Sequence, residues 1–147
     1  MDYSEKLISI AKKVFAKNPL DELILGEAIN LPTDIKYDSV ISCGVFHYFP
    51  DLKYAETVME KMTEKSAKSV GIINIHDADK EAAFLKCRRE ITPNYDELYK
   101  DLPKLFFTKK FFEDFAKKHN LDIEITLLPL EGFWDNDFLF DVFMYKR

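Results

Sequence analysis

The stretch from Ser69 to Ile75 limits what this 147-residue chain can fold into more than any other part of the sequence. It is rich in β-branched residues and almost continuously apolar. Such a run is typical of a strand that is covered on both faces, as strands of parallel sheets are. The run therefore predicts an inner strand of an α/β sheet.

Helices and strands alternate around this run. Helical spacing of apolar residues predicts helices that begin near Asp2, at Asp51 and at Thr108, each of which can cap a helix start. Asp2 with Glu5 three residues later resembles a capping box. The first of these helices is expected to gather apolar residues on one face, namely Leu7, Ile8, Ala11, Val14 and Phe15.

Short apolar runs predict the remaining strands, at 23–25, 37–42, 122–128 and 138–145. The last two follow each other without a helix between them. We therefore expect a mostly parallel Rossmann-like sheet that finishes with an antiparallel strand pair. Residues 76–102 are charged and carry a predicted helix over 80–89, so we interpret them as a lid or insertion within a single domain spanning 1–147.

Charge and composition exclude several functions. The net charge of −5 and the pI of about 5.3 oppose binding to phosphate backbones, so nucleic acid is not an expected partner. No apolar run approaches the roughly 20 residues of a membrane-spanning helix, and the first residues lack a signal-peptide pattern. Cys43 and Cys87 have no metal or redox spacing, which predicts reduced thiols in a cytoplasmic protein.

Two stretches carry a resemblance to a known family, Gly-Glu-Ala-Ile-Asn-Leu-Pro at 26–32 and Tyr-Asp-Ser-Val-Ile-Ser-Cys-Gly-Val-Phe-His-Tyr-Phe-Pro-Asp at 37–51. Together they resemble class I S-adenosylmethionine-dependent methyltransferases of the type 11/12-like group. In that family an acidic residue followed by a small one ends the third strand beside the adenine amino group, and Glu27 and Ala28 stand there.

The resemblance implies further cofactor contacts. The fourth strand of the family ends at the cofactor and substrate pocket, which corresponds here to Cys43, Gly44 and Val45. The opening of the chain is similar to the end of the second strand, where an acidic residue binds the ribose hydroxyls. Asp2 and Tyr3 are the matching residues, although Asp2 can equally be only a helix cap. A carboxylate suits the ribose because it accepts hydrogen bonds from both hydroxyls.

One part of the family pattern is missing. Members open with a strand that ends in an acidic, glycine-rich loop, whereas the four glycines here are scattered, at Gly26, Gly44, Gly71 and Gly132. We therefore expect a methyltransferase domain that lacks its first strand and most of its second. The resulting gap in the sheet would be closed by rearrangement or shared with a second chain, either another copy or a complementing one.

The resemblance implies methyl transfer from S-adenosylmethionine to a small-molecule or sugar-like acceptor that the lid selects. His47 and Tyr48 are the candidate catalytic residues, since a titratable histidine suits neutral pH, although both can simply begin the next helix. The alternative function is a non-catalytic methyltransferase-like domain that serves as a folded subunit or interaction module.

Three other groups have two readings each. The run His76-Asp77-Ala78-Asp79 suggests a metal site, but no further ligand follows at a suitable spacing, so we expect none. Arg88 and Arg89 can grip an anionic substrate or form a solvated helix face. Asp38 can be structural or catalytic, and we expect it to be structural.

Overall fold

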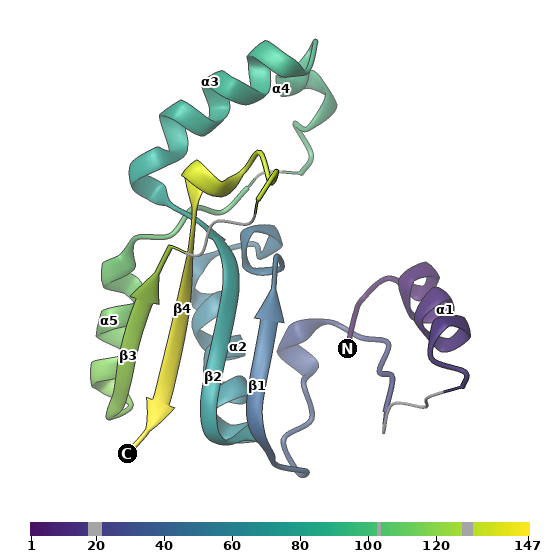
Figure 1. Ribbon diagram of the computed structural model, residues 1–147, viewed down its shortest axis with the longest axis vertical. Helices are drawn as coiled ribbons and strands as arrows, with labels where there is room; N and C mark the ends of the chain where they lie inside the picture. Colours follow the sequence, from purple (N-terminus) through teal and green to yellow (C-terminus); the bar gives the residue numbers. More distant parts are fainter. Residues whose placement is uncertain (18–21, 103, 128–130) are drawn as a thin grey trace.

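The computed structural model describes residues 1–17, 22–102, 104–127 and 131–147. Within them, one sheet has the strand order β1-β2-β4-β3 (Figure 1). β1 is parallel to β2, and β4 is antiparallel to both β2 and β3, so β4 alone runs in the opposite direction. This confirms the predicted α/β sheet with its antiparallel final pair. The strands are β1 Tyr37–Cys43, β2 Ser66–His76, β3 Leu121–Thr126 and β4 Leu139–Lys146.

Two helices cover one face of this sheet, and the others lie outside it (Figure 1). α2 and α5 contribute to the same buried cluster as the inward residues of β2 and β4. α3 and α4 lie beyond the carboxyl ends of β1 and β2, and α1 lies beyond the free side of β1. Their bounds are α1 Glu5–Val14, α2 Leu52–Lys65, α3 Glu81–Ile91, α4 Tyr95–Leu98 and α5 Lys109–Lys118, with single turns η1 Ala28–Asn30, η2 Phe46–Tyr48, η3 Ala78–Lys80 and η4 Asn136–Phe138.

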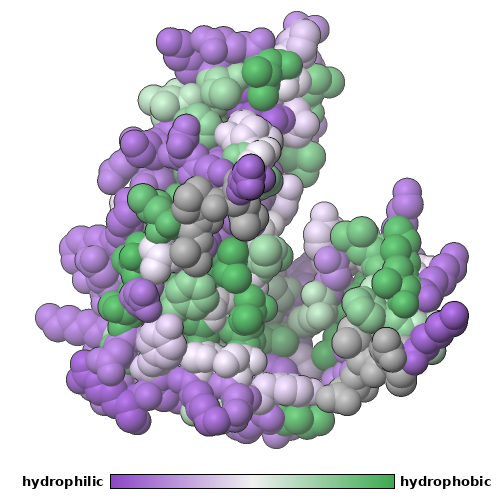
Figure 2. All heavy atoms as spheres, in the orientation of Figure 1, coloured by the Kyte–Doolittle hydropathy of each residue, from purple (hydrophilic) through white to green (hydrophobic). Residues whose placement is uncertain are grey.

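Alternation along the strands explains which face is packed. In β4, Phe140, Val142 and Met144 point into the cluster with α2 and α5 and expose at most 1% of their surface. On the opposite face Ile41 is 63% exposed, and Figure 2 shows apolar residues gathered over the strands there. The prediction that Ser69–Ile75 is covered on both faces is therefore only half right, because no described helix packs on this second face.

The start of the chain differs from the prediction. α1 is capped by Ser4, whose hydroxyl accepts a hydrogen bond from the Leu7 amide at 3.3 Å. Asp2 is instead held in an extended bridge to Leu25, donating to the Ile24 carbonyl and accepting from the Gly26 amide. The cap predicted at Asp2 is therefore wrong, because Ser4 caps α1, and the strand predicted at 23–25 is reduced to the isolated parallel bridge at Leu25.

The remaining helix predictions hold with one exception. Asp51 and Thr108 cap α2 and α5 by accepting hydrogen bonds from the Tyr54 and Phe111 amides. In α1, however, only Ile8 of the apolar face is buried. Leu128, the last residue of the predicted strand 122–128, lies outside the described residues, as do residues 129 and 130. None of the described helices is long and apolar enough to cross a membrane.

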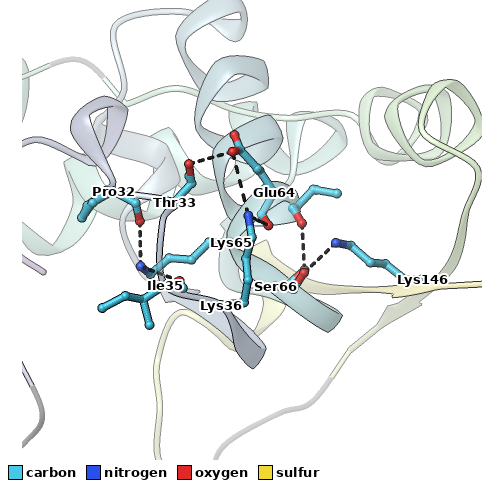
Figure 3. Close-up of polar contacts among 9 residues, drawn as sticks. Pro32, Thr33, Ile35, Lys36, Glu64, Lys65, Ser66 and Lys146 are labelled. Carbon is cyan, nitrogen blue, oxygen red and sulfur yellow. Dashed lines mark hydrogen bonds and ion pairs between the residues drawn. The ribbon is translucent and has the colours of Figure 1, made fainter.

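A buried ammonium group fixes the segment before β1 to the end of α2 (Figure 3). Lys65, a residue that exposes 9% of its surface, donates from Nζ to the Pro32 carbonyl at 2.6 Å and to the Ile35 carbonyl at 3.2 Å. Next to it, Lys146 Nζ donates to the Ser66 carbonyl at 2.6 Å. The turn before β1, the end of α2 and the end of β4 are thus held at one point, which sets the start of both parallel strands.

Replacing Lys65 with methionine tests this contact. The apolar stem stays packed, but two carbonyls lose a charged, buried donor, so the free energy of unfolding should fall by about 1.5–3 kcal/mol. Lys36→Met is the matched control, because Lys36 Nζ bonds the Glu64 carbonyl from a half-exposed position and should cost less than about 1 kcal/mol. Urea unfolding followed by circular dichroism measures both, and equal losses would contradict the argument.

Candidate functional site

The carboxyl ends of β1 and β2 lie side by side, since Cys43 is paired with Ile73. Open α/β sheets bind ligands beyond the carboxyl ends of their parallel strands. Three parts of the chain converge there: the turn η2 after β1, the last residue of β2, and the loop that leads into β4. They bring together two histidines and an aspartate that are distant in the sequence.

His47 and His76 form the centre of this site. Their ring centroids are 4.4 Å apart, and they expose only 8% and 3% of their surface. Asp135 Oδ2 lies 4.0 Å from His76 Nε2. Within the described residues, Nδ1 of each histidine and Oδ1 of Asp135 are buried without a hydrogen-bond partner. Unpaired buried polar atoms are costly, so these three atoms are candidates for hydrogen bonding to a ligand or an ordered water.

Backbone hydrogen bonds and aromatic rings hold the histidines in place. The Leu105 amide donates to the His47 carbonyl at 2.9 Å, and the Phe107 amide donates to the His76 carbonyl at 2.8 Å. Phe84 from α3 and Phe106 meet the His76 ring edge-on, at 4.8 and 5.4 Å between centroids. The site is therefore walled by rings, which keep its dielectric constant low.

Burial decides the charge of these groups. It lowers the pKa of His47 to about 3 and that of His76 to about 4, and the positive charge of Lys104 lowers both further. Both imidazoles are therefore neutral at pH 7. Burial raises the pKa of the Asp135 carboxyl, while the charges of Arg88 and Lys104 oppose that shift. Neutral rings can accept a hydrogen bond at Nδ1, which a charged imidazolium cannot do.

These pKa values predict an acid-sensitive fold. Between the folded values near 3 and 4 and the ordinary value of 6.5, the unfolded chain binds protons that the folded chain does not. The contribution of the neutral histidines to the free energy of unfolding is therefore complete above pH 6.5. It decreases as the pH falls, by at most about 1.4 kcal/mol per pH unit for each histidine. His47→Asn and His76→Asn should each flatten the unfolding free energy measured between pH 6.5 and 4.5. Slopes identical to that of the unsubstituted chain would contradict the assignment.

The cofactor residues predicted after β1 lie at the same edge. Cys43 has an exposed, free thiol, and Val45 is 38% exposed. The Gly44 amide donates to the Ile73 carbonyl at 2.9 Å, and its φ of 62° is a left-handed value. A Cβ added to Gly44 would meet no atom within 4 Å, so its backbone is open to close approach by a ligand.

The other predicted cofactor residues are brought together on a separate segment. The bridge between Asp2 and Leu25 places Asp2 near Glu27, across a hollow from β1 (Figures 1 and 2). Asp2 is half-buried and uses Oδ1 to accept from the Ser4 amide at 2.8 Å. Glu27 is exposed, Ala28 packs against the core, and Tyr3 is 77% exposed.

Of the two predicted catalytic residues, only His47 is enclosed. Tyr48 is 56% exposed, and Lys104 Nζ lies 3.8 Å from the centre of its ring. Sequence reasoning missed His76 as the partner of His47, as well as Asp135 and Lys104. No sequence signal joins them, since Asp135 sits in a polar turn and Lys104 in a charged segment.

The run 76–79 is explained by other contacts. Asp77 caps η3 and pairs with Lys109 Nζ at 2.6 Å. Within the described residues no group of three or more candidate ligands can hold a metal ion. An open hollow of about 640 Å³ lies nearby, lined in part by Asn74, Asp77, Lys109 and Asp141. Two of its polar contacts are internal, the Asn74 amide with Asp141 Oδ1 and Asp77 with Lys109, and we place the site at the histidines.

The architecture is similar to that of several methyltransferases of known structure. No family model and no curated protein sequence matches the chain. Magnesium protoporphyrin IX methyltransferase from Synechocystis PCC 6803, with bound SAH, superposes with a TM-score of 0.69 at 11% identity, over 99% of this chain and 62% of that one. For N-methyltransferase NodS from Bradyrhizobium japonicum WM9 the TM-score is 0.65 at 11% identity, over 99% of this chain and 70% of that one.

A further structure, an S-adenosylmethionine-dependent methyltransferase from Clostridium acetobutylicum ATCC 824, gives a TM-score of 0.65 at 11% identity, over 98% of this chain and 72% of that one. The chain thus spans less than two thirds of the Synechocystis enzyme and somewhat more of the other two. The described chain has the fold of the class I S-adenosylmethionine-dependent methyltransferases.

Proposed function

We propose that the chain binds S-adenosylmethionine and transfers its methyl group to a small-molecule acceptor held beside His47. The observation that carries this proposal is the arrangement at the carboxyl end of β1, where the open backbone of Gly44 stands three residues from a buried, uncharged histidine pair. When bound, S-adenosylmethionine supplies an activated methyl group on a sulfonium centre. Methyl transfer then asks the protein mainly for positioning and a dry pocket.

The residues present fit such a cofactor. The carboxylate of Asp2 has one oxygen engaged by the Ser4 amide, and Oδ2 makes no hydrogen bond to a described residue, so it can accept from a ribose hydroxyl. Glu27 and Ala28 on the neighbouring segment would meet the adenine edge, and Tyr3 would lie beside them. Cys43, Gly44 and Val45 would line the cofactor from the β1 side.

His47 is suited to orienting the acceptor rather than removing its proton. A pKa of about 3 makes the imidazole a weak base at neutral pH. Its unpaired Nδ1 can still accept a hydrogen bond from an acceptor O–H or N–H. The neutral rings also place no positive charge against a sulfonium. Tyr48, exposed at the rim, would contact the acceptor through its ring.

Two glycines with the same backbone strain allow a matched test of the cofactor site. Gly44 and Gly132 both have positive φ and open space around an added Cβ. Gly44→Ala should weaken S-adenosylmethionine binding about tenfold or more in calorimetric titration, because the methyl group fills space that the cofactor needs. Gly132→Ala bears the same backbone cost in the turn before β4 and should bind like the unsubstituted chain. No heat at millimolar ligand with the unsubstituted chain would overturn the proposal.

The second candidate is a folded subunit with no catalytic role. It is favoured by the side of β1 away from β2, which pairs with no described strand, and by the exposed residues Leu7, Ile10 and Val14 of α1. Unpaired strand edges and apolar helix faces are surfaces on which protein chains associate.

Light scattering separates the two candidates when it is combined with the titration. A mass above that of one 17.3 kDa chain, without S-adenosylmethionine binding, would favour the subunit. The mass of a single chain together with cofactor binding would contradict it.

A further inference from the structure

We infer that Arg88 and Lys104, next to the histidine pair, bind a small organic anion through its carboxylate or phosphate group. The inference rests on the proposed function only where it identifies this anion as the methyl acceptor. It assigns different roles to Arg88 and Arg89, which are adjacent and which the sequence alone does not tell apart.

Arg89 is already paired, whereas Arg88 is not. Arg89 makes a two-point contact with Asp96, through Nε at 2.9 Å and Nη2 at 3.1 Å. The Arg88 guanidinium makes no hydrogen bond or ion pair with any described residue. Its guanidinium lies instead 5.1 Å from the ring centres of Tyr95 and Trp134 and 5.6 Å from that of Tyr99. Rings near a guanidinium give cation–π attraction but accept none of its five N–H donors in the way that an oxyanion does. Arg88 is therefore placed by the rings and left available for an anion.

Lys104 supplies the second positive charge. Its ammonium group lies over the Tyr48 ring and pairs with no carboxylate of the described chain. Lys104 and Arg88 both act on the pKa values of His76 and Asp135, so both charges lie near the same buried groups. They approach the site from different elements, Arg88 from α3 and Lys104 from the segment that leads to α5.

The charges at the site do not balance. Arg88 and Lys104 contribute two positive charges, and both histidines are neutral at pH 7. Asp135 contributes at most one negative charge, and it forms no ion pair with either cation. At least one positive charge is therefore left uncompensated beside a poorly solvated site, where an anion is attracted more strongly than in water.

The unpaired histidine nitrogens add a second requirement. Nδ1 of His47, Nδ1 of His76 and Oδ1 of Asp135 can act as acceptors, and none has a described partner. A bound anion that also carries an O–H or N–H group would donate to one of them while its charged end meets Arg88. Such a ligand is a hydroxy- or amino-substituted acid or phosphate. Under the proposed function, that same hydroxyl or amino group is the one that receives the methyl.

The test uses Trp134, the only tryptophan in the sequence, whose ring lies against Arg88. Its indole N–H signal is followed by NMR during titration with para-hydroxybenzoate, without S-adenosylmethionine. The uncharged para-hydroxybenzamide has nearly the same shape and should bind at least about tenfold more weakly. Phenyl phosphate in a parallel titration shows whether the site prefers phosphate to carboxylate.

Two neighbouring variants make the test specific. Arg88→Gln should raise the Kd about 10- to 100-fold, since charged hydrogen bonds are lost, whereas Arg89→Gln should leave it unchanged. Lys104→Gln should also weaken anion binding, and this effect does not depend on the packing of α3 and α4. Thermal melts check that each variant is folded. Equal binding by the Arg88 and Arg89 variants, or equal binding of the acid and the amide, would overturn the inference. Because no cofactor is added, the result is independent of the cofactor titration.

Discussion

Two backbone hydrogen bonds, from Leu105 to His47 and from Phe107 to His76, organise the upper end of this molecule. They bring the chain back from α3 and α4 to the carboxyl ends of both parallel strands. The ring of Phe107, whose amide makes the second of these bonds, is fully buried against Phe46 and Phe112, so the same segment positions α5 on the sheet. The core and the candidate site therefore share one piece of backbone, and a change that loosens it affects both.

The parts of the fold that sequence reasoning found are those with local patterns. β2 is recognisable because its sequence is rich in β-branched residues and almost continuously apolar, and α5 because Phe112, Phe115 and Ala116 recur at helical spacing behind a threonine cap. Reliance on local patterns also explains why the prediction for the start of the chain is wrong. A capping box at Asp2 is a local pattern, but the bridge to Leu25, more than twenty residues away, determines where α1 begins.

The candidate site could be predicted only in part, because it is assembled from distant residues. His47 was found because it follows a recognisable strand. His76 was considered only with its sequence neighbours, which suggested a metal, although its true neighbours are His47 and Asp135. The difference between Arg88 and Arg89 is likewise invisible in the sequence, since it depends on which arginine faces Asp96 and which faces Trp134.

The position of β4 has a consequence for how the protein acquires its shape. β4 is the last described strand in the sequence, yet it stands between β2 and β3, and Ser69 finds its partner at Tyr145. β1, α2 and β2 can associate early, because they are contiguous in the chain. β3 has no strand to pair with until residues Leu139–Lys146 have been synthesised and have paired with β2 as strand β4. Such distant pairings close slowly, so a half-made sheet with an unpaired β2 edge should persist during synthesis and need protection from aggregation.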